Sequence, residues 1–229
     1  MLPMLNSQAL SSRKLIYFTS AAMLVLLAWD ASGLDMLIAL FSGNNKGFAL
    51  RDNWLLTKIF HDGMQRLSWM LIAYLGLAIW WPLGVMTQLT RSQRLQLLTT
   101  TLLAALAVSV LKSNSATSCP WDLSAFGGMA HYASHWTALT DGGSGGCFPA
   151  GHASTGFAFL SGYFVFRETA PKVAHAWLSG ALITGLILGI AQQMRGAHFM
   201  SHTLWTAWIC WAIAFAMDSV WRSFVRIKI

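Results

Sequence analysis

Residues 174–194 read AHAWLSGALITGLILGIAQQM, a run of 21 residues without Asp, Glu, Lys or Arg. About 20 consecutive apolar residues are needed to cross the hydrocarbon core of a bilayer as an α-helix. The backbone N–H and C=O groups find no water there, so such a segment satisfies them internally by forming a helix. This stretch therefore predicts a membrane-spanning helix.

The rest of the chain has the composition of a membrane protein. Of its 229 residues, 55% are apolar and 10% are charged, whereas a soluble domain carries about 25% charged residues. Five further apolar runs approach spanning length, at 15–29, 67–89, 95–111, 152–166 and 198–220. The sequence therefore predicts an all-α polytopic membrane protein with six transmembrane helices, in a single domain covering 1–229.

The distribution of Lys and Arg predicts the orientation of these helices, because cytoplasmic loops carry an excess of both. Six spans put both termini on one side. If that side is the cytoplasm, its segments carry nine basic and two acidic residues, a net charge of +7. These residues are Arg13, Lys14, Arg91, Arg94, Arg167, Lys172, Arg222, Arg226 and Lys228, with Glu168 and Asp218. The outer segments carry six residues of each sign, so the whole excess of positive charge lies on the cytoplasmic face. The basic residues are scattered, and no nucleic-acid partner is expected.

Two outer segments are long. Residues 30–66 contain apolar stretches at 34–41 and 54–60 that are too short to span, so they predict interfacial helices or a re-entrant pair. Residues 113–151 are rich in Gly, Ser and Thr and predict a loop. Long loops in compact proteins are often functional.

Several unusual side chains fall at helix ends on the predicted outer face. Lys112 ends the third span and Arg195 follows the fifth, while His152 and His198 begin the fourth and the sixth. Helix N-termini bind anions through free N–H groups and the helix dipole, and Gly151 allows the backbone to approach a ligand closely. An oxyanion, most simply phosphate, fits this set. One His could attack phosphorus while the other protonates the leaving alkoxide.

These positions form a pattern that resembles the type-2 phosphatidic-acid phosphatase family. The motifs of that family are K-x6-R-P, P-S-G-H and S-R-x5-H-x3-D. The first appears here as Lys112, six residues, and then Cys119 and a proline. The second appears as PAGH at 149–152, and the third lies around GAHFMSH at 196–202. The resemblance covers about residues 105–215.

The resemblance implies a mechanism. His198 is similar to the nucleophile that forms a phosphohistidine intermediate, and His152 to the general acid for the leaving group. Lys112 is similar to a phosphate ligand. The resemblance implies neither a metal nor another cofactor.

Four motif positions depart from the family pattern. The expected Arg, Ser, Arg and Asp are replaced by Cys119, Ala150, Gln192 and His202. Arg195 lies one helical turn after Gln192, and we hypothesise that it replaces the missing guanidinium as a phosphate ligand. Asp122 is a candidate carboxylate for the acid–base pair. His202 could orient His198 as a neutral acceptor.

Two of the three cysteines, Cys119 and Cys147, lie in the same outer loop. An oxidising periplasm permits a disulfide there. In the chain-entropy model such a bridge contributes on the order of 3 kcal/mol. Cys210 lies within a predicted span and is interpreted as a small buried apolar residue.

The other polar residues of the outer segments have plainer interpretations. His131, His135 and Trp136 could line a substrate mouth, but a solvated loop is the favoured interpretation. His61 and Asp62 are interpreted as capping or anchoring an interfacial helix.

Together these features predict a phosphatase of the bacterial inner membrane with cytoplasmic termini and a periplasmic active site. The expected partners are membrane lipids and a lipid phosphate or pyrophosphate substrate, such as polyprenyl pyrophosphate, a phosphatidate-type lipid or lipid A. A lipid phosphotransferase and a non-catalytic membrane relative are the alternatives. The spans are nearly free of charge, which favours an interfacial site over a transport pathway.

Overall fold

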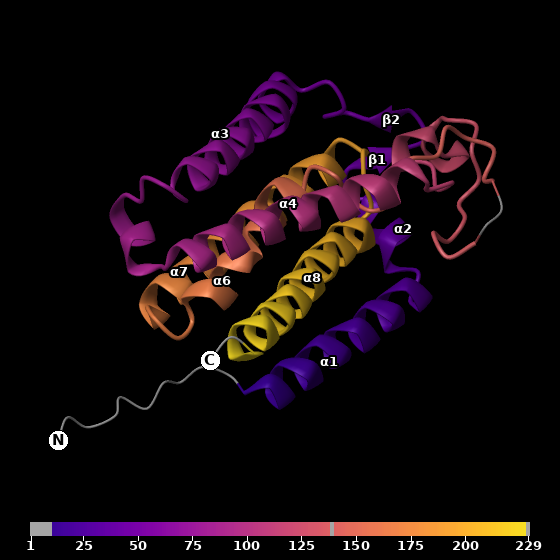
Figure 1. Ribbon diagram of the computed structural model, residues 1–229. Coiled ribbons are helices and arrows are strands. Elements are labelled where there is room, and N and C mark those ends of the chain that lie inside the picture. The colour runs from indigo at the N-terminus through magenta and orange to yellow at the C-terminus, as the bar shows by residue number, and fades with distance from the viewer. Residues whose placement is uncertain (1–10, 138–139, 228–229) are drawn as a thin grey trace.

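Figure 1 shows the computed structural model, which describes residues 11–137 and 140–227. Lys228, counted above with the cytoplasmic charges, lies outside the described residues. The described chain is largely helical. Its elements are α1 (Ser12–Ala31), α2 (Leu34–Ala39), β1 (Gly43–Asn44), β2 (Gly47–Phe48), the π-helix η1 (Leu55–Gly63), α3 (Met64–Leu77), the 3-10 helix η2 (Gly84–Gln88), α4 (Arg91–Ser113), the 3-10 helices η3 (Pro120–Asp122) and η4 (Ser124–Phe126), α5 (Ser154–Phe157), the 3-10 helix η5 (Ala158–Leu160), α6 (Ser161–Phe166), α7 (Pro171–Met194) and α8 (Met200–Ile227).

Four of the described helices are long and apolar enough to cross a membrane by length and composition. They are α1, α4, α7 and α8, and they lie where four of the six spans are predicted. Local signals explain two of their starts. Thr90 and Gln93 form a capping box before α4, with each side chain bonding the backbone of the other residue. Pro171 occupies the first turn of α7, where its missing N–H costs nothing.

The predicted span at 67–89 differs from the structure. The α-helix α3 begins at Met64 and ends at Leu77, and it continues directly from the π-helix η1. The stretch 54–60, expected as a separate interfacial helix, is therefore part of the same helical rod. Pro82 and the left-handed Gly84 (φ 55°) follow the end of α3, and neither suits a continuing helix.

The predicted span at 152–166 is helical from Ser154 but shorter than expected, and it is interrupted by η5. Nearly all of its side chains are buried, because α4, α7 and α8 surround it. A Cβ atom at Gly156 would lie 2.4 Å from the backbone nitrogen of Gly185, so only glycine permits α5 to approach α7 this closely.

The helices form a bundle with two distinct ends (Figure 1). α8 lies between α1 and α4, and it contacts both. The start of α1 and the end of α8 lie at one end of the bundle, whereas the β1–β2 hairpin and the loop after α4 lie at the other. The loop end is the one predicted to be outer, and segments 30–66 and 113–151 therefore meet there.

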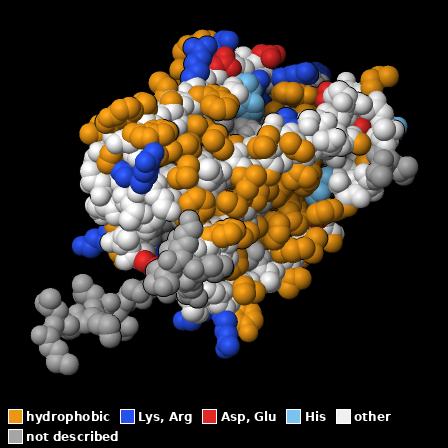
Figure 2. Space-filling model, viewed as in Figure 1, with side chains coloured by type: hydrophobic (Ala, Val, Ile, Leu, Met, Phe, Trp, Pro, Cys, Tyr) orange, Lys and Arg blue, Asp and Glu red, His pale blue; other side chains and the backbone are white. Residues whose placement is uncertain are grey.

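Apolar side chains cover the middle of the bundle surface. Figure 2 shows hydrophobic groups across this face, with charged groups gathered toward its edges. At the end opposite the loops, Asp218 is buried and its Oδ2 atom lies 2.8 Å from both Arg167 Nη2 and Arg222 Nε. Buried carboxylates are tolerated when paired in this way.

Candidate active site

The ends of α4, α7 and the segments before α5 and α8 meet at the loop end of the bundle. Lys112, in the last turn of α4, donates a hydrogen bond from Nζ to the carbonyl oxygen of Gly146 at 2.6 Å. A Cβ atom at Gly151 would lie 3.1 Å from Lys112 Cδ, so the backbone just before His152 packs on the lysine stem. The structure thus brings Lys112, Gly151 and His152 together.

His152 lies just before α5 and is largely buried. Burial first, and then neighbouring positive charges, lowers the pKa of His152 to about 3. Those charges belong to His61, Lys112 and Arg195, and the nearby carboxylate of Asp62 acts in the opposite direction. At neutral pH the ring of His152 is therefore neutral in the empty site, and a bound anion would favour its protonation.

His198 lies between α7 and α8 and is 3% exposed. Its Nδ1 atom lies 3.5 Å from Sγ of Cys147. Burial, followed by the charges of His202, Lys112 and His152, lowers the pKa of His198 well below its ordinary value. A neutral imidazole keeps a free lone pair, which a nucleophile requires.

The two cysteines of the loop after α4 are joined in the structure, which confirms the predicted disulfide. Cys119 and Cys147 form a disulfide with their Cα atoms 5.2 Å apart. The bridge ties the segment after α4 to the backbone that leads into His152. Because Sγ of Cys147 also lies beside His198, the disulfide contacts the candidate nucleophile directly.

Arg195 follows α7 at the same end of the bundle. Its Nε atom donates to the carbonyl oxygen of Arg51 at 2.8 Å, and Nη1 donates to Oε1 of Gln192 at 3.1 Å. The guanidinium also lies 5.9 Å from the ring centroid of Trp121. Arg195 and Gln192 therefore share one side of the helix end, as their spacing predicts.

The structure adds a pair that the sequence did not assign to the site. The ring centroids of His61 and His152 lie 3.5 Å apart with an angle of 30° between the planes. His61 Nδ1 lies 2.8 Å from Asp62 Oδ1, and Lys58 Nζ lies 3.1 Å from Asp62 Oδ2. In the sequence, the only sign of this pair was the adjacent His and Asp in a segment predicted to be outer. About 90 residues separate them from His152, so no local motif links them to it.

The two candidate orienting residues occupy different surroundings. Asp122 accepts a hydrogen bond at 3.4 Å from the hydroxyl of Ser144, and its role toward His152 stays a prediction. His202 is buried, with its ring edge-on to those of Phe148 and Phe199. Its Nδ1 atom is buried without a hydrogen-bond partner among the described residues.

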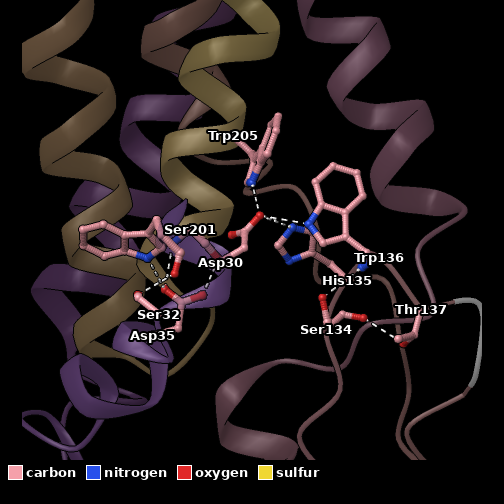
Figure 3. A network of polar contacts seen from close by, with 10 residues as sticks. Asp30, Ser32, Asp35, Ser134, His135, Trp136, Thr137, Ser201 and Trp205 are labelled. Atoms are coloured by element: carbon pink, nitrogen blue, oxygen red, sulfur yellow. Dashed lines mark hydrogen bonds and ion pairs between the residues drawn. The ribbon is translucent and has the colours of Figure 1, made fainter. Parts of the chain in front are cut away.

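Two of the three loop residues expected to be solvated, His135 and Trp136, are instead anchored, whereas His131 is exposed. The ring of His135 stacks on Phe148 at 4.0 Å, and its Nε2 atom lies 3.2 Å from Asp30 Oδ2. The indoles of Trp136 and Trp205 each donate to the same carboxylate oxygen at 2.9 Å, as Figure 3 shows. One carboxylate at the end of α1 therefore holds both the loop after α4 and α8.

A second carboxylate fixes the start of α8 (Figure 3). Asp35 Oδ1 accepts hydrogen bonds at 3.0 Å from the backbone N–H of Ser201 and from Nε1 of Trp29. The hydroxyl of Ser201 donates to the other oxygen. Because Ser201 lies three residues after His198, Asp35 helps to fix the position of the candidate nucleophile.

One group of described side chains has the spacing of a metal site. Nitrogens of His198 and His202 and Sγ of Cys147 lie within 4.8 Å of one another. The sulfur is bonded to Cys119 and cannot serve as a thiolate ligand. Two imidazoles remain, too few for a typical structural or catalytic zinc site.

An apolar cavity opens beside the polar cluster. Its volume is about 540 Å³, and Lys112, Gly151 and His152 line one end of it. The remainder runs between α3 and α4 past apolar side chains that include Trp69, Ile72, Leu102 and Leu106. A second apolar cavity of about 380 Å³ lies on the other side of α3, and both cavities reach Ser68 and Thr155.

Four helices have spanning length, and two imidazoles and a lysine lie at one end of the bundle. These features are those of a helical membrane protein with a candidate site for a phosphate ester. The protein belongs to the PAP2 superfamily, whose family model matches residues 93–225, more than half of the chain. The family predicted from the motifs is thereby confirmed, and it supports a phosphatase-type activity on phosphate esters. No curated protein and no solved structure matches the chain.

Proposed function

We propose that the protein hydrolyses a lipid-linked phosphate or pyrophosphate monoester at the periplasmic face of the bacterial inner membrane. The observation that carries the proposal is the cavity between α3 and α4. Its polar end holds Lys112 and His152, and its long apolar part suits a hydrocarbon chain. A substrate with a phosphate head and an apolar tail matches both halves.

The first step forms a phosphohistidine. His198 Nδ1 faces the Cys147 sulfur, so Nε2 is the nitrogen that attacks phosphorus. The new P–N bond forms as the P–O bond to the lipid breaks, and His152 transfers a proton to the leaving oxygen. Lys112 and Arg195 hold the phosphoryl oxygens by charge-assisted hydrogen bonds, which strengthen as negative charge develops in the transition state.

The second step releases phosphate. His152, now neutral, takes a proton from water as the water attacks phosphorus. The P–N bond breaks, and its electron pair returns to His198. Burial keeps both imidazoles neutral in the empty enzyme, so His198 is competent to attack without prior deprotonation.

The proposed topology has six crossings with both termini in the cytoplasm. Four helices have spanning length and composition. The helix α3 and the buried segment from α5 to α6 supply the other two crossings, and η1 precedes the first of them on the outer side. The excess of Lys and Arg at the end opposite the loops supports this orientation. Candidate substrates are polyprenyl pyrophosphate, phosphatidate-type lipids and lipid A.

A second candidate function is transfer of the phosphoryl group to a lipid instead of water. The second apolar cavity, on the other side of α3, favours it, because it adjoins the first at Ser68 and Thr155 and could hold the tail of an acceptor. The phosphohistidine intermediate serves either acceptor.

Phosphate release from a panel of lipid phosphates by the purified protein tests the proposal. We expect release from at least one lipid, inhibition by vanadate as a mimic of the pentacoordinate state, and no activity in His198→Ala or His152→Ala. Free phosphate indicates hydrolysis, whereas a phosphorylated lipid product indicates transfer. A folded wild-type protein that turns over no lipid would leave the non-catalytic alternative.

A further inference from the structure

The imidazoles of His61 and His152 stack where the π-helix η1 meets the turn before α5. Their centroids are 3.5 Å apart. His61 Nδ1 contacts Asp62 Oδ1 at 2.8 Å, and because an ionised carboxylate only accepts hydrogen bonds, Nδ1 carries a proton. The bond to Asp62 therefore leaves Nε2 as the free ring nitrogen of His61.

Charged and titratable groups from every surrounding element act on His152. They are His61 and Asp62 from η1, Lys112 from α4, Arg195 after α7 and His198 before α8. Asp62 is the carboxylate of this set. Hydrogen bonds from His61 and then Lys58 lower the pKa of Asp62, so it is ionised at neutral pH.

Two stacked imidazoles in such surroundings cannot both be charged. Imidazolium rings 3.5 Å apart repel each other, and Lys112 and Arg195 add further positive charge. The two rings therefore carry at most one positive charge between them. Because Asp62 bonds directly to His61, that charge, and the extra proton that bears it, is favoured on His61 when no phosphate ester is bound.

We propose that His61 and Asp62 are positioning residues that hold the ring of His152 and determine which of the two imidazoles carries the proton. This rests on the phosphatase function proposed above, in which His152 performs the acid–base step. A phosphate ester bound beside Lys112 and His152 brings negative charge to His152 and draws the proton there. Once that proton has passed to the leaving oxygen, His152 is neutral and accepts one from the attacking water.

The location of the pair supports this role. The family match covers residues 93–225, so His61 and Asp62 come from a part of the chain outside it. Their element is a π-helix, a rare conformation that often occurs at functional sites. The π-helix η1 thereby supplies a carboxylate, Asp62, near His152. His198 lacks the carboxylate that the family's third motif provides, because His202 occupies that position.

Histidine NMR on the detergent-solubilised full chain tests the inference directly. The ring carbon signal of His152, assigned with His152→Gln, is titrated with and without inorganic phosphate. We expect Asp62→Asn to lower the midpoint of His152 by about half a pH unit or more, and His61→Gln to raise it by a similar amount. Unmoved midpoints in both folded variants would overturn the proposal.

The pH dependence of kcat supplies a second readout that a purely structural role would not move. The alkaline limb reports loss of the proton from the general acid in the enzyme–substrate complex. We expect Asp62→Asn to move this limb to lower pH, His61→Gln to move it to higher pH, and Asp62→Glu to restore it. Lower activity at every pH with an unmoved limb would contradict the proposal.

Two further variants serve as comparisons. His175→Gln removes an exposed imidazole that contacts the Pro171 carbonyl oxygen at the far end of α7. We expect its NMR midpoint for His152 and its alkaline limb to match those of the wild type. If Asp122→Asn moves the limb and Asp62→Asn does not, the carboxylate role belongs to Asp122. If the wild type hydrolyses no lipid, the proposed function fails, whereas the NMR midpoints still decide the inference.

Discussion

The ammonium group of Lys112 donates a hydrogen bond to the carbonyl oxygen of Gly146, with 2.6 Å between Nζ and oxygen. Gly146 has a positive φ of 68° and immediately precedes Cys147 of the disulfide. The backbone of the loop after α4 therefore holds the ammonium group of Lys112 in position at the end of that helix. The candidate phosphate ligand and the loop thus form one structural unit.

Replacement of Lys112 tests its role as a phosphate ligand. We expect Lys112→Met to lower kcat/KM for lipid phosphate hydrolysis by about 100-fold, because a charge-assisted contact to the phosphoryl group is lost. Lys112→Arg keeps the charge and should recover part of the activity. A Lys112→Met enzyme with wild-type kinetics would show that the lysine only anchors the loop.

Loss of the disulfide should destabilise the loop end of the bundle. We expect Cys119→Ser to lower the free energy of unfolding by about 3 kcal/mol in the chain-entropy model. Wild-type protein should change its mobility on non-reducing gels after reduction, and the variant should not. Cys210→Ser, at a buried thiol in α8, is the matched control and should keep the shift.

Arg195 is predicted to replace the guanidinium that the family places at Gln192. We expect Arg195→Ala to raise KM about tenfold, because one charged contact to the phosphoryl oxygens is lost. The KM of Arg195→Lys should lie between those of the wild type and Arg195→Ala, because lysine keeps the positive charge but lacks the planar guanidinium. If the hypothesis holds, Gln192→Arg in the Arg195→Ala background recovers activity, whereas unchanged phosphate release by Arg195→Ala would refute it.

We expect the free energy of unfolding to fall in acid, because folding disfavours protonation of His152. Its pKa in the folded protein is about 3, below the ordinary value of 6.5, so folding favours the neutral ring. The corresponding stability is fully present above about pH 6.5 and is lost as pH falls toward 3, with a slope of at most about 1.4 kcal/mol per pH unit. Unfolding measured between pH 7 and pH 4 should show a shallower slope for His152→Gln. His175→Gln should keep the wild-type slope.

Asp30 should hold the outer loop against the bundle. Its Oδ2 atom accepts hydrogen bonds from Trp136 and Trp205. We expect Asp30→Ala to destabilise the protein by about 2 kcal/mol, because two indole N–H groups lose their acceptor. Limited proteolysis should then cut the loop faster than in Trp136→Phe, which removes one donor and leaves the carboxylate. Equal cleavage rates in Asp30→Ala and the wild type would argue against this anchor.

The sequence determined the features that depend on local composition and spacing. Apolar runs of spanning length predicted α1, α4, α7 and α8, because lipid leaves a backbone no other way to satisfy its hydrogen bonds. The Lys and His spacing predicted the family. The placement of Lys112 and His152 at helix ends followed from the same segments, since the motifs fall where the apolar runs stop.

Only the tertiary structure decided what joins the site from distant segments. The end of α3 at Leu77 and the π-helix before it were not readable from hydropathy, which registers apolar content and not the hydrogen-bond pattern of the backbone. Contact between His61 and His152 depends on how η1 packs near α5, and no local pattern records it. The candidate phosphate site predicted from two histidines therefore has a third imidazole beside it, that of His61, which only the packing of the helices reveals.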